Sequence, residues 1–263
     1  MKTLLVAIHG ILTNQTDASW PDKLDAWMFT RDPSVKVLKK EYAAGPFPHW
    51  NCWIKDPALA HSLANELELF LQPDHGSPSP PLEERDGERR PFSRQRVPHQ
   101  SINPPIHQSA PPALWFVAHS NGAVIALLTA QILIARGYTI AGIILTGAAV
   151  EADICKNHIF AWYCELSLRA AIAYSSADDQ VLNGDSRTAT AFRSKIRSWL
   201  WGTFMQPYGC LGRTGWLNGG KPLNPELKCL FTRWTPGGHS TYFLKDNIQS
   251  TFEQIYHDIT AVS

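Results

Sequence analysis

The stretch LWFVAHSNGA at residues 114–123 is the part of the sequence that decides the fold. An apolar run enters a turn containing Ser120, and a strongly apolar segment of helical length follows at 123–135. Small residues at Ala118 and Gly122, two positions to either side of the serine, allow a sharp turn from a strand into a helix. Such a turn raises a serine hydroxyl above the sheet, near a helix N-terminus. The pattern predicts an exposed nucleophile, although an ordinary strand-helix junction with a capping serine shares it.

The rest of the chain alternates between short apolar runs and longer segments of helical period. This alternation is typical of a parallel sheet with crossover helices. We expect strands at 3–8, 35–42, 114–118, 140–145, 170–174 and 229–234. We expect helices at 19–28, 58–71, 123–135, 187–199 and 245–261. The sequence therefore predicts a single α/β domain over residues 1–263.

One segment interrupts the alternation. Ten of the 19 prolines lie between Pro73 and Pro112, and the charges of this segment nearly cancel. A loop of that length is uncommon inside a compact domain unless it is a lid or an inserted segment. We interpret 73–112 as an extended, flexible insertion just before the strand that leads to Ser120. Its role as a lid, a partner-binding segment or a dispensable excursion stays open.

Composition excludes several classes of protein. The chain has 263 residues, of which 44% are hydrophobic, and a net charge of +1. This balance argues against a nucleic-acid-binding protein, which would normally carry a basic face. No apolar run is long enough to span a membrane, and the run before His9 is too short for a signal peptide. Five cysteines without paired short spacings indicate neither a disulfide framework nor a zinc site. We therefore expect a cytoplasmic protein without a metal or other cofactor.

Two later strands are followed by residues that complete the chemistry of a reactive serine. A serine hydroxyl needs a base to take its proton and a third group to orient that base. The predicted strand at 170–174 is followed by an acidic turn with Asp178 and Asp179. The predicted strand at 229–234 is followed by a Gly-rich loop with His239. Since the carboxyl ends of parallel strands meet at one edge of a sheet, the three groups are expected to converge there.

The sequence resembles the α/β-hydrolase superfamily at these positions, and the resemblance covers nearly all of the chain outside the Pro-rich insertion. The motifs that carry it are IHGI at 8–11, AHSNG at 118–122, SSADDQVL at 175–182 and GGHS at 237–240. The resemblance implies an α/β-hydrolase fold, a mostly parallel sheet with helices on both faces. Ala118 stands where the family more often has glycine, a small departure that some lipases share.

The resemblance also implies roles for individual residues. Ser120 would be the nucleophile and His239 the general base. Asp178 is the favoured orienting acid, because family members usually place the acid three residues before an apolar residue, here Val181. Asp179 is the alternative.

The oxyanion hole would use the backbone N–H groups of Ile11 and Asn121. The plain His-Gly sequence before Ile11 lacks the triple-glycine form that accompanies a preference for tertiary alcohols. His119 should point away from the nucleophile by strand alternation, which favours a packing or supporting role.

The loops at the carboxyl edge are rich in aromatic residues and poor in charge. The residues that we expect to line a substrate pocket are Phe47, Trp50, Trp53 and Trp162. Such a pocket suits a small ester with an apolar acyl or aromatic group, although these side chains could equally pack the loops onto the core. Residues 150–170 are interpreted as a small cap over the site.

The function predicted from the sequence is that of a serine hydrolase, most simply a carboxylesterase or lipase-like esterase that forms an acyl-enzyme. Two alternatives stay open. The same triad also serves thioesterases and amidases. A catalytically silent protein of the same fold that binds a ligand or partner is the alternative from another class.

Overall fold

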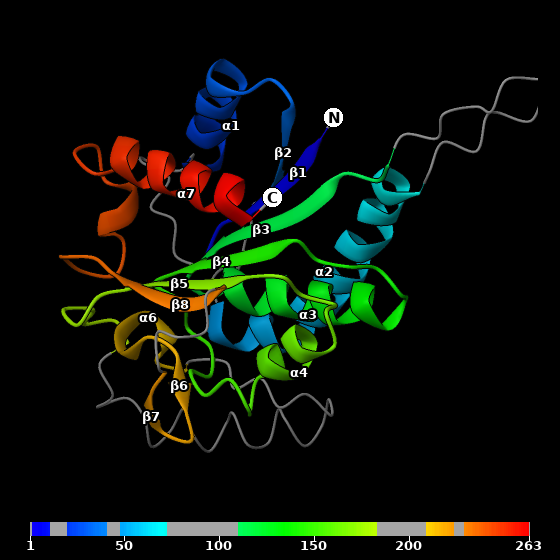
Figure 1. Cartoon of the computed structure of the whole chain (residues 1–263). Coiled ribbons are helices and arrows are strands. Elements are labelled where there is room, and N and C mark those ends of the chain that lie inside the picture. Colours follow the sequence, from blue (N-terminus) through cyan, green and yellow to red (C-terminus); the bar gives the residue numbers. More distant parts are fainter. Residues whose placement is uncertain are drawn as a thin grey trace, which may run out of the picture.

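The structure of the chain, a computed structural model, describes residues 2–10, 20–40, 48–72, 110–182, 209–223 and 229–262, with only the backbone for 48–55. Its centre is a six-stranded parallel sheet in the order β2-β1-β3-β4-β5-β8 (Figure 1). The strands are β1 (Thr3–Ile8), β2 (Val35–Lys40), β3 (Ala113–His119), β4 (Gly142–Thr146), β5 (Ala171–Ser175) and β8 (Leu230–Trp234). The parallel sheet that the sequence predicts is confirmed.

The inner strands are buried along nearly their whole length, as expected when helices cover both faces of a parallel sheet. Every residue of β1, β4 and β5 is buried, whereas the edge strand β2 alternates between buried and more exposed positions. β3 lies between β1 and β4 and pairs with both over its length. The strand that leads to Ser120 is therefore held by hydrogen bonds on both edges.

Helices cover the two faces of the sheet in separate layers (Figure 1). One face carries α1 (Trp20–Arg31) and α7 (Ile248–Val262), and the other carries α2 (Pro48–Leu71), α3 (Gly122–Ala135) and α4 (Ile159–Cys164). Alternate residues of each strand accordingly enter different cores. Leu5 packs in the cluster that holds Phe252 of α7, and its neighbour Val6 packs in the cluster that holds Leu63 of α2. The layered α/β-hydrolase fold implied by the resemblance is present.

The smaller elements lie between β5 and β8 and beyond β8. They are α6 (Leu211–Thr214), the antiparallel pair β6 (Leu217–Asn218) and β7 (Lys221–Pro222), and the 3₁₀ helix η2 (Thr241–Phe243). The β6–β7 hairpin is attached to the loop after β4, because Asp153 Oδ2 accepts the backbone N–H of Gly220 at 3.2 Å. No helix in the described ranges has both the length and the apolar character that crossing a membrane requires.

One helix prediction differs from the structure, and another falls outside the described residues. α2 begins at Pro48, ten residues before the predicted start at 58, and continues through Pro57. A proline inside a helix removes one backbone hydrogen bond, but this loss does not end a helix whose later turns bury an apolar face. The helix predicted at 187–199 lies outside the described residues, and so does nearly all of the insertion at 73–112.

A hydrogen-bonded cluster ties α7 to the last two strands of the sheet. Tyr174 of β5 donates its hydroxyl to Asp258 Oδ2 at 2.7 Å, and Arg233 of β8 donates Nε to the same oxygen at 2.8 Å. Arg233 Nη2 also pairs with Asp258 Oδ1. Burial and the neighbouring Asp258 carboxylate raise the pKa of the Tyr174 phenol. The Asp258 carboxyl group is thus buried, and both of its oxygens have partners.

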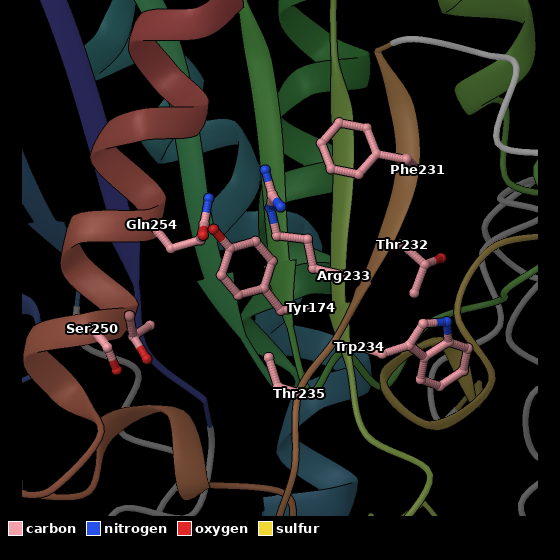
Figure 2. Close-up of a pocket in the computed structure, with 9 residues that line it drawn as sticks. Tyr174, Phe231, Thr232, Arg233, Trp234, Thr235, Ser250 and Gln254 are labelled. Carbon is pink, nitrogen blue, oxygen red and sulfur yellow. The ribbon is translucent and has the colours of Figure 1, made fainter.

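Next to this cluster the surface is hollowed between β8 and α7 (Figure 2). The hollow has a volume of about 460 Å³ and is lined mostly by polar side chains, among them Thr235, Ser250 and Gln254. Arg233, Tyr174 and Gln254 extend toward one another in it (Figure 2).

Replacing Asp258 by alanine is expected to lower the free energy of unfolding by about 2–3 kcal/mol. The value lies below the range for a wholly buried ion pair, because the Arg233 side chain is 31% exposed. Urea denaturation measures the loss. Asp22→Asn is the matched control, since its partner Lys39 is well exposed, and it should change stability little. Equal effects of the two variants would contradict the buried role of Asp258.

Candidate active site

Ser120 lies at the turn between β3 and α3 with a left-handed backbone. Its φ is 55°, a conformation that residues other than glycine adopt rarely and at some cost in energy. Two hydrogen bonds from the end of β4 hold the turn: Ser120 donates its N–H to Thr146 O at 3.1 Å, and its own carbonyl accepts from Ala149 N at 3.3 Å. The strand-turn-helix unit predicted from the sequence is present, with the serine side chain half-buried.

Two glycines make room for this turn. A Cβ on Gly10, at the end of β1, would lie 2.7 Å from the Cβ of Ser120 and 3.0 Å from the carbonyl of His119. A Cβ on Gly122 would lie 2.7 Å from the carbonyl of Ile8. Real Cβ atoms do not approach other atoms this closely, so the backbone beyond β1 and the serine turn can meet only because both positions are glycine.

His239 reaches the serine from the loop after β8. Its Nε2 lies 2.9 Å from Ser120 Oγ, and its Nδ1 lies 2.8 Å from Asp179 Oδ2. The His239 side chain is 11% exposed, and that of Asp179 is wholly buried. The structure therefore brings serine, histidine and carboxylate into one hydrogen-bonded line at the carboxyl edge of the sheet.

The carboxylate in this line is Asp179 and not the favoured Asp178. Asp179 closes a turn by donating its N–H to Ser176 O at 3.1 Å, which points its side chain inward, while Asp178 is exposed. The count of three residues to an apolar position was taken from Val181, which is 61% exposed. Counted from Leu182, whose N–H donates to Asp179 Oδ1 at 3.1 Å, the same spacing selects Asp179.

His119, the residue before the serine, supports the loop that carries His239. The His119 Nε2 lies 3.0 Å from the backbone carbonyl of His239. The residue is 5% exposed. Burial above all, and then the proximity of His239, lower the pKa of His119 to about 3. The ring is therefore neutral at physiological pH.

Behind the turn, a second carboxylate contacts the residue after the serine. Asp56 of α2 is wholly buried, and its Oδ2 accepts from Asn121 Nδ2 at 3.4 Å. No local pattern in the sequence marks Asp56 as a site residue. An Asp just before a proline is typical of a helix N-cap, which is usually exposed. Asp56 is buried because α2 begins earlier and Asp56 lies inside the helix.

Several predicted site residues cannot be placed at the site. Ile11 and Phe47 lie outside the described residues, and for Trp50 and Trp53 only the backbone of α2 is described. Trp162 is placed elsewhere: its carbonyl accepts from Ser167 and Leu168, just before the amino end of β5. This is the opposite end of a strand about 15 Å long.

The predicted cap over 150–170 is corrected in the same way. α4 packs against the sheet on the α3 side as part of the connection from β4 to β5 (Figure 1). The sequence shows that this connection contains aromatic residues, but it does not show in which direction the connection runs. Only the beginning of the connection lies near Ser120, through Ala149.

Within the described ranges, no group of three or more His, Cys, Asp or Glu side chains is arranged to hold a metal ion. The cysteines described there, Cys155, Cys164, Cys210 and Cys229, are all free.

No protein-family model matches the chain, and no curated protein matches it. Among solved structures it is similar to YbtT, a type II thioesterase from the yersiniabactin pathway, at 12% identity over 99% of this chain and 94% of that chain, with a TM-score of 0.45. Human thioesterase 2 matches at 11% identity over 100% and 98% of the two chains, with a TM-score of 0.44. An arylesterase matches at 10% identity over 100% and 77%, with a TM-score of 0.39. Similarity at this level carries no information on the substrate of this chain.

The depressed pKa of His119 predicts an acid dependence of stability. The pKa is about 3 in the folded chain and 6.5 in an unperturbed histidine, so below pH 6.5 only the unfolded chain takes up this proton. The free energy of unfolding should therefore decrease as the pH is lowered from 6.5 to 3, by up to about 1.4 kcal/mol per pH unit for this one proton. Urea denaturation of the wild type and of His119→Gln at several pH values in this window measures the difference. Parallel pH dependences of the two proteins would contradict a neutral, buried His119.

Proposed function

We propose that the chain is a serine hydrolase that cleaves carboxylic esters through an acyl-enzyme intermediate. Ser120 is the nucleophile, His239 the general base and Asp179 the acid that orients His239. The observation that carries the proposal is the hydrogen-bonded line from Ser120 Oγ through the two His239 ring nitrogens to Asp179 Oδ2, with distances of 2.9 and 2.8 Å. Three groups from three different strand ends form it, on the side of the sheet where ligands of open α/β folds bind.

The buried Asp179 carboxylate sets the protonation of the base. Because it can only accept, His239 Nδ1 carries the hydrogen and Nε2 is free to accept the proton of Ser120. As that proton moves to Nε2, Ser120 Oγ attacks the ester carbonyl carbon. The imidazolium then gives the proton to the leaving alkoxide as the ester C–O bond breaks.

The second half of the reaction repeats these steps with water. His239 takes a proton from the water that attacks the acyl group on Ser120, and returns it to the serine oxygen as the carboxylic acid leaves. No external oxidant, reductant or cofactor enters either half.

The negative charge that develops on the carbonyl oxygen needs donors fixed in advance. We assign this role to the backbone N–H groups of Asn121 and Ile11. Asn121 is the N-cap of α3, so its N–H lies at the positive end of a helix dipole. The contact between Asp56 and the Asn121 side chain supports a fixed orientation of this peptide. Ile11 follows Gly10, whose Cα lies against Ser120.

The proposed substrate is a small ester with an apolar acyl or aromatic group, for which Phe47, Trp50 and Trp53 are the proposed binding residues, and the proposed location of the protein is the cytoplasm. The same machinery can hydrolyse thioesters and amides. One acyl group presented as an oxygen ester, a thioester and an amide separates these activities by their kcat/KM values.

Ser120→Ala is expected to abolish turnover of p-nitrophenyl esters while leaving the fold intact, because it removes only the attacking oxygen. Turnover is measured by nitrophenolate release, and folding by thermal melting. Labelling with a fluorophosphonate probe gives an independent readout: the wild type should be labelled at Ser120 and the variant should not. A folded wild type that resists the probe would overturn the proposal and favour a catalytically silent binding protein.

The two adjacent aspartates offer a matched pair of variants. Asp179→Asn should lower kcat by about 10³–10⁴-fold, because an amide in place of the buried carboxylate favours the wrong tautomer of His239. Asp178→Asn changes an exposed side chain and should leave kcat within about twofold of the wild type. Steady-state kinetics on one p-nitrophenyl ester decides. The reverse order of effects would return the acid to Asp178.

A further inference from the structure

His239 is held at both ends by two consecutive residues of the chain. At the ring end, Nε2 lies 2.9 Å from Ser120 Oγ, and at the backbone end the carbonyl lies 3.0 Å from His119 Nε2. The planes of the two rings are tilted by 48° to each other, with centroids 5.1 Å apart. The dipeptide that ends β3 therefore contacts the histidine twice.

The direction of the His119 hydrogen bond follows from its partner. A backbone carbonyl can only accept, so His119 Nε2 must carry the hydrogen. In the neutral ring, Nδ1 then carries none. This fits its surroundings, because His119 Nδ1 is buried and has no hydrogen-bond partner among the described residues. A bare ring nitrogen in that position costs less than a buried N–H without an acceptor.

The loop that carries His239 needs such a support. It follows the edge strand β8 and contains Gly237, whose φ is +98°, followed by Gly238. Two consecutive glycines give a backbone with much conformational freedom. Hydrogen bonds restrain it at both ends and at Gly237: Thr235 N donates to Ser175 O at 2.9 Å, Ser176 Oγ donates to Gly237 O, and Thr241 N donates to Gly238 O at 3.1 Å. At His239 itself the backbone is bound by His119 and the ring by Asp179.

The exit of β4 is shaped to accept this loop. A Cβ on Gly147 would lie 2.8 Å from the carbonyl oxygen of His239 and 3.5 Å from His119 Nε2. Only the missing side chain at Gly147 lets the carbonyl reach the His119 ring. The ring is itself fixed by a face-to-edge contact with Phe243, at a centroid distance of 5.4 Å, and lies on β3, which is paired on both edges.

We propose that His119 is a positioning residue, whose Nε2–H holds the backbone of His239 so that its ring stays aligned between Ser120 and Asp179. The proposal rests on the serine-hydrolase function proposed above. Because the nucleophile and this donor are neighbours on one rigid strand, any shift of β3 carries both along. The hydrogen bond from His119 therefore links the position of the base directly to the strand that carries the nucleophile, in addition to the link through the glycine-containing loop and β8.

Three substitutions of His119 separate the hydrogen bond from the shape of the side chain. Gln can place an N–H near the position of the histidine Nε2, Asn presents the same amide one methylene too short, and Leu fills the space without a donor. We expect His119→Leu and His119→Asn to lower kcat by about 10–100-fold with KM little changed, the loss typical of a misaligned catalytic group. His119→Gln should recover most of the lost rate.

Two rates are measured, each at a temperature where melting curves show the variant folded: turnover of a p-nitrophenyl ester, and the second-order rate of fluorophosphonate labelling at Ser120. A packing role would lower the melting temperature of all three variants without this kcat-specific loss. If His119→Leu does not fold, the comparison of Gln with Asn stands alone. Equal rates for Gln and Asn, or wild-type rates for Leu, would overturn the proposal. A wild type that is not labelled would instead refute the hydrolase function itself.

Discussion

At Ser120 the backbone leaves the β region for the left-handed region, with φ of 55°, and the surrounding chain is built to keep it there. Hydrogen bonds to Thr146 and Ala149 hold the residue from the β4 side, and Gly10 and Gly122 remove the atoms that would collide with it. A single residue in this conformation costs on the order of 1–3 kcal/mol. The strain is tolerated because β3 is paired on both sides, so the strand cannot relax without breaking the centre of the sheet.

The other two groups of the line reach Ser120 from β5, which is paired on both edges, and from the edge strand β8. Asp179 is fixed by a turn of its own backbone and by burial. His239 depends on a glycine-containing loop, and its alignment comes from contacts at its two ends. The site thus combines a rigidly held Ser120 with His239, whose position depends on its contacts. The buried, neutral ring of His119 supplies one of these contacts.

Much of this arrangement follows from the sequence, because its strongest signals are local. The strand at 3–8 is predicted at its observed bounds, and Ser120 and His239 were found from the residues that follow strands. The same reasoning did not identify the acid, because Asp178 and Asp179 are adjacent and differ only in the direction in which the turn points their side chains. Asp56 was missed because α2 begins well before Pro57. Trp162 was misplaced because the connection from β4 to β5 runs along the sheet and not over its carboxyl edge. Such outcomes depend on tertiary packing, which no short pattern encodes.

β8 has a single neighbouring strand, β5, in the described sheet, and the Arg233–Asp258 pair attaches it to α7. Edge strands with one partner exchange their amide hydrogens through small opening motions that leave the rest of a domain folded. Opening of this kind at β8 would carry the His239 loop out of reach of Ser120. The protein would then exist in a folded state that cannot react, and its activity would be lost on heating before its helices and central strands melt.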